Sequence, residues 1–205
     1  MPILGITGGI ASGKSTFRKL LLERIPADSF DADACARELL EKDESVKNQV
    51  RERIHPQAYE ADGTVNRDLL RELIYQDATK KSSLEAILHP MVRERWSRQA
   101  REAKTVSRLF VVDIPLLFET KAESLFDLIV TVACSQAVQL ERLRTQRGLT
   151  EEISLKIIAT QAPMSLKISG SHHVIWNDGD LASLTAQTDL FARHWQAVSQ
   201  NHHEA

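Results

Sequence analysis

A glycine-rich loop near the amino end has the residue types and the spacing to bind a polyphosphate. Residues 8–15 read Gly-Gly-Ile-Ala-Ser-Gly-Lys-Ser and match the pattern G-x-x-x-x-G-K-[ST] in full. Glycines let the backbone curl so that several N–H groups point at one anion, and a helix starting near Lys14 aims the positive end of its dipole at the same place. We expect Lys14 to reach the β- and γ-phosphates of a nucleotide, and the Ser15 hydroxyl to bind Mg²⁺.

The alternative for this loop is a glycine turn before a helix, with a lysine there by chance. Four fixed positions match by accident on the order of once in a hundred chains of this length. The flanking sequence favours the functional interpretation, because residues 2–7 are apolar and residues 15–25 carry apolar side chains at helical spacing. The residues predicted to bind ATP are Gly8, Gly9, Ala11, Ser12, Gly13, Lys14, Ser15 and Thr16.

Two aspartates near the start of a second predicted helix are candidates for acid–base chemistry. Asp31 and Asp33 follow a short strand-like segment. In a kinase that acts on small molecules, one carboxylate near the acceptor hydroxyl can orient that hydroxyl and accept its proton. An aspartate at a helix start is also a common N-cap. We expect Asp31 to have the structural role and Asp33 the chemical one.

A third aspartate, Asp113, ends the apolar run Leu109-Phe110-Val111-Val112. Such a continuous run fits a strand that is buried on both faces of a parallel sheet. A carboxylate at the end of that strand indicates a Walker-B-like position near the metal ion and its waters. The alternative is an aspartate that caps the next turn.

The predicted helices and strands form a scaffold that would bring these side chains together. Strand-like runs alternate with helical patterns, which is typical of an α/β fold with a mostly parallel sheet. The predicted strands cover residues 2–7, 29–30, 108–114, 126–133 and 173–176, and the predicted helices cover 15–25, 34–40, 136–144, 151–161 and 181–199. Ligands in such folds bind beyond the carboxyl ends of the strands, where Gly8, Asp31 and Asp113 would converge.

Residues 41–104 differ from the rest of the chain, because they are polar, charge-rich and helical in pattern without a convincing strand. The sequence predicts breaks there at His55-Pro56, Asp62-Gly63 and His89-Pro90. We expect a single unit with its core at residues 1–40 and 105–205, a helical insertion at 41–104 and a lid at 142–165.

The composition of the 205 residues is that of an ordinary globular protein, with 42% hydrophobic residues, 26% charged residues and a net charge of -2. Nothing indicates a nucleic-acid partner, which usually requires a basic patch. Cys35 and Cys134 are predicted to be buried free thiols in a reducing compartment. The start lacks a signal-peptide pattern, and no apolar stretch approaches the roughly 20 residues of a membrane span. We expect a cytoplasmic protein without a membrane partner, as a monomer or weak homo-oligomer.

The motifs, taken in order, resemble those of the dephospho-CoA kinase family. Residues 5–15 resemble the family's opening, as does Asp-Ala-Asp at 31–33 followed by Ala36-Arg37. Further matches are Ala-Asp-Gly-Thr at 61–64, the His-Pro segment at 84–90, Asp-Ile-Pro-Leu-Leu-Phe-Glu at 113–119, Gln161 and the closing stretch at 174–179. The resemblance covers roughly residues 3–180, and the segments beyond the phosphate loop are far more specific than the loop itself.

The resemblance implies a fold, a reaction and a site. The fold is a P-loop NTPase core of three α/β/α layers around a parallel sheet, with a helical insertion on the CoA side and a mobile lid. The family transfers the γ-phosphate of ATP, with Mg²⁺, to the ribose 3′-hydroxyl of dephospho-CoA and so completes coenzyme A. Asp33 would be the general base, Lys14 would hold the phosphoryl group, and Ser15 and Asp113 would lie at the metal. By the same resemblance Asn177 would bind ATP, and the residues at the acceptor would be Asp33, Arg37, His89, Pro115 and Leu116.

Two departures from the family pattern affect the lid and the nucleotide side. The family usually has an arginine where this chain has Gln146, with Arg142, Arg144 and Arg147 close by. We expect Arg142 and Arg147 to stabilise the charge on the phosphoryl group together, the alternative being a solvated helix face. Trp176 stands where the family tends to have an aspartate, which removes a polar contact there.

Two other functions compete with this interpretation. Another P-loop kinase, acting on a nucleoside, nucleotide or sugar acid, would share the phosphate loop but not the 113–119 segment. The third candidate is a nucleotide-binding switch or interaction protein that hydrolyses slowly. A GTPase of that kind would carry a guanine-reading Asn-Lys-x-Asp motif, and the sequence has none.

Overall fold

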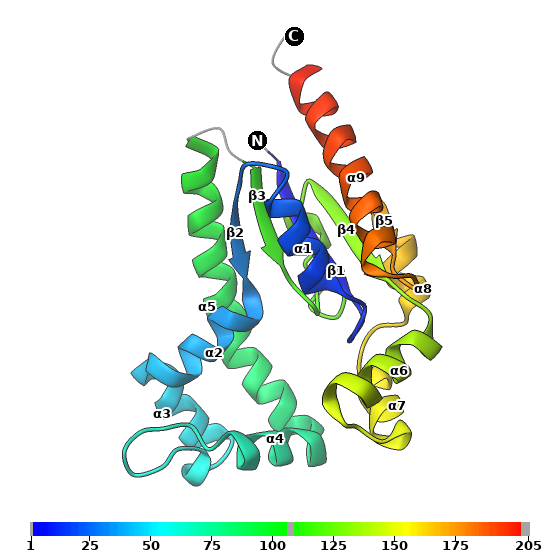
Figure 1. The fold of residues 1–205 in the computed structure, drawn as a ribbon. Coiled ribbons are helices and arrows are strands. Elements are labelled where there is room, and N and C mark those ends of the chain that lie inside the picture. Colours follow the sequence, from blue (N-terminus) through cyan, green and yellow to red (C-terminus); the bar gives the residue numbers. More distant parts are fainter. Residues whose placement is uncertain (1, 106–108, 202–205) are drawn as a thin grey trace. The chain divides into compact units, whose positions relative to one another are not determined.

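The computed structural model describes residues 2–105 and 109–201 (Figure 1). The chain separates into two compact units, Met1–Phe30 with Ala103–Ala205, and Asp31–Glu102. The start of the predicted strand at 108 lies outside the described residues. Within the described part, every helix is too short or too polar to cross a bilayer.

The first unit is built around a five-stranded sheet. Its strands are β1 (Ile3–Gly8), β2 (Ala27–Asp31), β3 (Leu109–Asp113), β4 (Leu128–Ala133) and β5 (His173–Trp176), in the order β2-β3-β1-β4-β5. The strand β1 pairs in parallel with β3 and β4, and β4 pairs in parallel with β5. The α/β fold with a parallel sheet that the sequence predicts is therefore confirmed. The carboxyl ends of β1, β3, β4 and β5 meet at one edge, which is where a ligand binds in such sheets.

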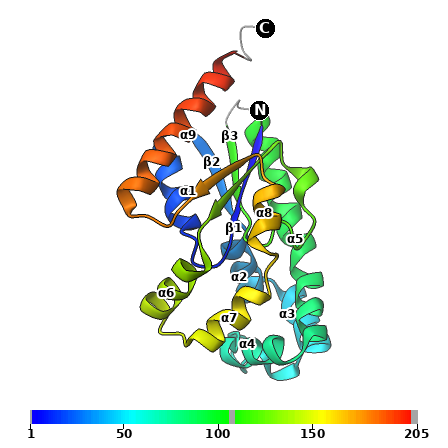
Figure 2. The ribbon, with the colours of Figure 1, turned by 90° about the vertical axis from the view of Figure 1, so that its right-hand side faces the viewer.

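Helices cover both faces of this sheet. The helices of the first unit are α1 (Lys14–Leu22), the short η2 (Glu123–Leu125), α6 (Gln136–Arg147), α7 (Glu151–Ala159), α8 (Met164–Ser169) and α9 (Leu181–Asn201). Helices α1 and α9 lie side by side on one face, and α8 packs on the other (Figure 2). The α8 helix falls in a segment for which the sequence predicts no element.

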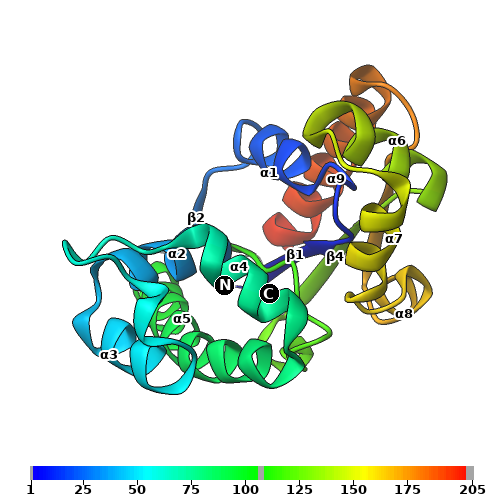
Figure 3. The ribbon, with the colours of Figure 1, turned by 90° about the horizontal axis from the view of Figure 1, so that it is seen from below.

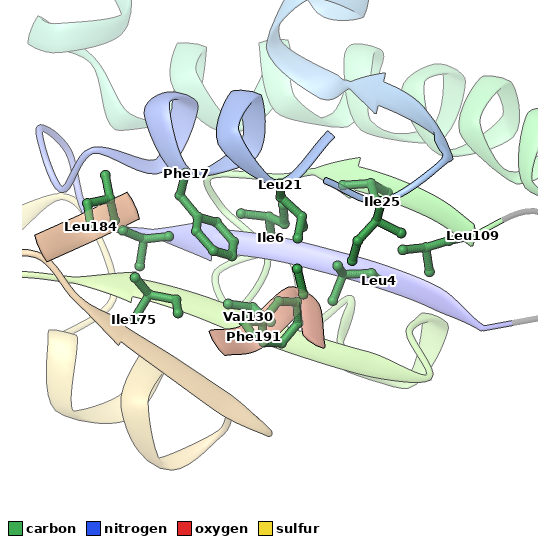
Figure 4. Packing of buried hydrophobic residues seen from close by; sticks show 13 residues of the cluster. Leu4, Ile6, Phe17, Leu21, Ile25, Leu109, Val130, Ile175, Leu184 and Phe191 are labelled. Carbon is green, nitrogen blue, oxygen red and sulfur yellow. The ribbon is translucent and has the colours of Figure 1, made fainter. Parts of the chain in front are cut away.

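The core of the first unit lies between the sheet and the α1–α9 pair (Figure 4). Phe17 of α1 meets Phe191 of α9 edge to face, with ring centroids 6.0 Å apart. Fully burying a side chain of this kind contributes about 1.5–3 kcal/mol, so this layer fixes α1 on the sheet. Because α1 begins in the loop after β1, the same packing holds the loop at the sheet edge. The strand residues in this cluster are Leu4, Ile6, Leu109, Val111, Val130, Val132 and Ile175.

The second unit is helical (Figure 3). It contains α2 (Ala32–Lys42), α3 (Glu44–Arg53), the short η1 (Pro56–Ala58), α4 (Arg67–Gln76) and nearly all of α5 (Ala78–Thr105). It begins at Asp31, before the predicted start of the insertion at residue 41, because α2 belongs to it. Asp43 ends α2 and caps α3 through Val46 N–H, and the Tyr59 hydroxyl donates to Leu40 O.

One predicted break in the second unit was wrong. The helix α5 runs through Pro90, where the sequence predicted an interruption. A proline inside a helix removes one hydrogen bond and crowds the preceding turn, at a cost of about 3 kcal/mol or more. Side chains on both sides of it, including Leu88, Val92 and Trp96, are buried, and their burial outweighs that cost. The other two breaks are confirmed, by η1 after His55 and by the left-handed backbone of Gly63.

Candidate active site

The phosphate-binding loop turns sharply between β1 and α1. Ala11 and Gly13 both have left-handed backbone, with φ of 58° and 89°. A Cβ on Gly13 would overlap the Nδ2 atom of Asn177, so this position needs glycine for its φ and for its space. A Cβ on Gly9 would lie 2.6 Å from Gln139 Nε2, so a second glycine allows another close approach.

Three successive carbonyl groups of the loop are each held by a side chain from elsewhere in the first unit. Gln139 Nε2 donates to Ile10 O at 2.8 Å, and Asn177 Nδ2 donates to Ser12 O at 2.8 Å. Between them, Arg142 Nη1 donates to Ala11 O at 3.1 Å. A trans peptide places its N–H opposite its carbonyl, so the N–H groups of Ala11 and Gly13 are turned away from these side chains. These three side chains therefore hold the loop in a shape that suits an anion.

The start of α1 adds further donors. Gly13 is the N-cap of α1, and within the described residues no side chain makes a capping hydrogen bond to this helix. The first N–H groups of a helix have no partner inside the helix, and they carry the positive end of its dipole. Lys14, Ser15 and Thr16 thus present backbone donors to a phosphate group.

Lys14 forms an ion pair with Asp113 across the sheet edge. The parallel register places Asp113 beside Ile6 of β1, and Ile114 N donates to Ile6 O at 3.0 Å. The Asp113 side chain is only 4% exposed, and its other oxygen lies 3.6 Å from Arg18 Nε. The structure therefore brings the predicted Walker-B-like carboxylate directly to the loop lysine. A bound phosphate would compete with this carboxylate for the ammonium group.

The residues present suit a magnesium ion that is shared with a nucleotide. The Ser15 hydroxyl and the Asp113 carboxylate are oxygen donors, as Mg²⁺ prefers. Among the described residues, no group of three or more His, Cys, Asp or Glu side chains could hold a metal ion by itself. Mg²⁺ in such sites takes most of its ligands from phosphates and water, so a pair of protein oxygens fits it.

The two arginines predicted to act on the phosphoryl group lie in different surroundings. Arg142 is half-buried, and its guanidinium also donates to Asn177 O at 2.9 Å. Arg147 is exposed at the last position of α6, before the left-handed Gly148. The structure thus joins Arg142 to the loop backbone, whereas Arg147 makes no hydrogen bond to the loop in the described part of the chain.

Cys134 follows β4 directly and lies near Arg142. Burial raises the pKa of its thiol to about 11, although the Arg142 guanidinium opposes that shift. The thiol is therefore neutral near pH 7 and unsuited to act as a nucleophile. Cys35 is also buried and free, as the sequence predicts for both cysteines.

Pro115 and Leu116, predicted to touch the acceptor, follow β3 in the first unit. The Pro115 carbonyl accepts from Thr7 Oγ1 at 3.1 Å, and Leu116 O accepts from Thr120 N at 3.0 Å. Thr7 directly precedes the phosphate loop, so the segment after Asp113 is bonded to the strand that carries the loop.

The remaining predicted acceptor-side residues lie in the second unit. Asp31 caps α2, since its carboxylate accepts from Ala34 N at 2.8 Å, and this structural role is confirmed. Asp33 and Arg37 are exposed on α2, Asp33 in the first turn. His89 is half-buried on α5, and burial lowers the pKa of its imidazole, partly offset by the Glu85 carboxylate. The catalytic and substrate roles of these residues stay predictions.

Sequence reasoning missed two residues that contact the loop or its supports. Gln139 lies on α6 with no motif around it, and only the fold brings its amide to Ile10 O. Lys167 lies on the unpredicted α8 and is fully buried. Gln161, noted in the sequence only as part of the family pattern, accepts from Ile10 N at 2.9 Å.

The fold and the loop define the class of protein. A parallel sheet whose first strand leads through a G-x-x-x-x-G-K-S loop into a helix is a P-loop nucleotide-binding fold. Within that class, the family model for dephospho-CoA kinase matches residues 2–183. The chain belongs to the dephospho-CoA kinase family.

Individual relatives agree with this assignment. The chain is 35% identical to a dephospho-CoA kinase of Bacillus cereus over 198 residues, which are 96% of this chain and 98% of the relative. It is 36% identical to a dephospho-CoA kinase of Bdellovibrio bacteriovorus, over 92% and 94% of the two chains.

Solved structures give the same fold. The structure of TT1252 from Thermus thermophilus superposes with a TM-score of 0.75 at 30% identity, over 94% of this chain and 97% of that one. A shikimate kinase from Acinetobacter baumannii superposes with a TM-score of 0.52 at 14% identity, over 98% and 94% of the two chains, and so shares the fold alone.

Proposed function

We propose that this protein transfers the γ-phosphate of ATP to the 3′-hydroxyl of the ribose of dephospho-CoA, giving coenzyme A. The observation that carries the proposal is a complete phosphate-binding loop, held by Gln139, Arg142 and Asn177, in a chain of the dephospho-CoA kinase family. Another P-loop kinase, the alternative from the sequence, is not favoured by that family membership.

The loop and the start of α1 would bind the triphosphate. Their N–H groups donate to phosphate oxygens, and the Lys14 ammonium moves from Asp113 to the β- and γ-phosphates. Ser15 and Asp113 would hold Mg²⁺. A bound Mg²⁺ ion would neutralise part of the negative charge of the phosphate groups. Phosphoryl transfer needs little covalent help, so positioning and electrostatics are the main work of these groups.

Asp33 is proposed to orient the ribose hydroxyl and to accept its proton. Asp33 is exposed in the first turn of α2, and a carboxylate there is of the chemical type that accepts a proton from a hydroxyl. Arg142 and Arg147 are the candidates for stabilising charge on the moving phosphoryl group. The two carbonyl bonds of Arg142 use two of its five N–H donors, so its charge and the remaining donors can act on a phosphoryl group.

The acceptor is proposed to contact Arg37, His89, Pro115 and Leu116 as well. A guanidinium at Arg37 suits the pyrophosphate of dephospho-CoA, and the half-buried, mainly neutral His89 suits a hydrogen bond to an uncharged part of it. We place the protein in the cytoplasm, as a monomer or weak homo-oligomer without a nucleic-acid or membrane partner. Two free, buried cysteines support a reducing compartment.

A panel of acceptors tests the proposal. Purified protein, ATP and Mg²⁺ are mixed with dephospho-CoA, adenosine, AMP or shikimate, and ADP release is followed. We expect release that depends on dephospho-CoA and is at background with the others. Release with another acceptor and none with dephospho-CoA would retain the phosphate loop and reject the acceptor.

A further inference from the structure

Lys167 is a fully buried cation outside the residues assigned to substrates. Its side chain is 0% exposed. The ammonium donates to Glu119 Oε1 at 2.9 Å and to Pro115 O at 3.2 Å. Both partners belong to the segment that follows Asp113, so one α8 side chain holds two points of that segment.

One partner leads to the start of the phosphate loop. The Pro115 carbonyl that Lys167 bonds also accepts from the Thr7 hydroxyl, and Thr7 is fully buried next to Gly8. Pro115 follows Asp113 by two residues, and Asp113 pairs with Lys14. A shift of Pro115 would therefore be felt at both the loop and its lysine.

The other partner leads to the tip of the loop. Glu119 Oε1 accepts from Ala162 N at 2.7 Å as well as from Lys167. The neighbouring Gln161 accepts from Ile10 N at 2.9 Å. The link between α7 and α8 is thus tied on one side to Glu119 and on the other to the loop.

This ion pair is a poor device for stability alone. Burying a charge costs several kcal/mol of desolvation, a cost that falls in full on Lys167 and in part on Glu119, whose side chain is 19% exposed. Within the described residues, Glu119 Oε2 is buried and has no hydrogen-bond partner. Both bonds fall on Oε1, so half of the carboxylate's acceptor capacity is unused. The pair does join three segments near the loop, namely α8, the segment that follows Asp113 and the link between α7 and α8.

We infer that Lys167 is a positioning residue for phosphoryl transfer, acting through Glu119 and Pro115 on the loop tip and on Asp113. The inference rests on the proposed kinase function. Gln139, Arg142 and Asn177 hold the loop independently of Lys167, so nucleotide binding should survive its loss. The alignment of the phosphoryl group should be lost with Lys167, and a displacement of about 1 Å can lower the rate about 100-fold.

Three variants separate positioning from stability. Lys167→Met removes the charge at similar length, Glu119→Gln removes the opposite charge, and the double variant removes both, which guards against misfolding from an unpaired buried carboxylate. Lys156→Met is the matched control, since Lys156 is an exposed lysine paired with Glu152 on α7.

We expect the double variant to unfold at a temperature near that of the wild type and to bind ADP within about threefold of it, with kcat for dephospho-CoA lowered about tenfold or more. Amide hydrogen exchange with ADP bound should be faster in residues 8–15 and 113–119, and Lys156→Met should change none of these. A double variant with wild-type kcat and wild-type exchange would overturn the inference. A wild-type protein that does not turn over dephospho-CoA rejects the proposed function instead, and the exchange data still decide the role of Lys167.

Discussion

The side-chain amide of Asn177 occupies the space that a Cβ on Gly13 would need, and from there it donates to the carbonyl of Ser12 at 2.8 Å. Asn177 follows β5, whereas Gly13 ends the loop after β1. Two motifs that lie far apart in the sequence, the phosphate loop and the closing stretch at 174–179, are therefore in direct contact through Gly13 and Asn177. This contact holds the backbone of the loop at Ser12 and Gly13.

Replacing Gly13 with alanine should abolish nucleotide binding, because the added methyl group displaces Asn177 and strains a φ of 89°. Titration with ADP followed by calorimetry measures the effect. Gly148→Ala is the matched control, since Gly148 also has a positive φ of 63° but nothing lies within 4 Å of its Cβ position. The control should lose about 1–2 kcal/mol of stability and keep ADP binding. Equal ADP affinity in the two variants would contradict this account of Gly13.

Removing the amide of Asn177 should weaken ADP binding about tenfold. The Asn177→Ala variant leaves the buried Ser12 carbonyl without its donor, which costs about 1–3 kcal/mol. Gln187→Ala provides the comparison, because Gln187 also bonds backbone near the end of β5, at Trp176, but does not contact the loop. If both variants bind ADP equally well, the amide of Asn177 does not support the loop.

The two aspartates of α2 should respond differently to the same chemical change. Asp33→Asn removes a proton acceptor and should lower kcat about 100-fold to 10,000-fold, with a small change in the KM for dephospho-CoA. Asp31→Asn keeps a good N-cap, so kcat and stability should stay close to those of the wild type. Steady-state kinetics of both variants test the assignment. Near-normal kcat in Asp33→Asn would show that another group takes the proton.

The stability of the protein should fall on mild acidification, in part through His89. Burial lowers the pKa of the folded imidazole from its ordinary value of 6.5. As pH falls below 6.5, the unfolded chain binds a proton that the folded chain resists, so the free energy of unfolding decreases. Thermal unfolding between pH 8 and pH 5 should show a smaller loss for His89→Gln than for the wild type. Parallel curves for the two proteins would mean that His89 does not contribute.

The parts of the site that the sequence predicts are those encoded by neighbouring residues. The loop at 8–15 and the strand at 173–176 depend on glycine, apolar runs and spacing, and both appear where expected. Asp113 could be placed at the loop because parallel strands share one ligand-binding edge.

The parts that the sequence does not predict depend on contacts between distant segments. Gln139 and Lys167 carry no local signature, since their partners lie over a hundred residues away in one case and about fifty in the other. Pro90 gives a strong local signal for a helix end, but burial of the residues around it overrides that signal. Local chemistry thus identifies the nucleotide loop, and tertiary packing decides what supports it.

Mass analysis of the product identifies the hydroxyl group that receives the phosphate. The wild-type protein is incubated with ATP, Mg²⁺ and dephospho-CoA, beside a Lys14→Ala variant as the loop control. We expect the acceptor to gain the mass of one phosphate group, and fragmentation to place this group on the 3′-hydroxyl of the adenosine ribose. The variant should give almost no product. An unchanged acceptor mass with the folded wild-type protein, or a phosphate at any other hydroxyl, would contradict the proposed function.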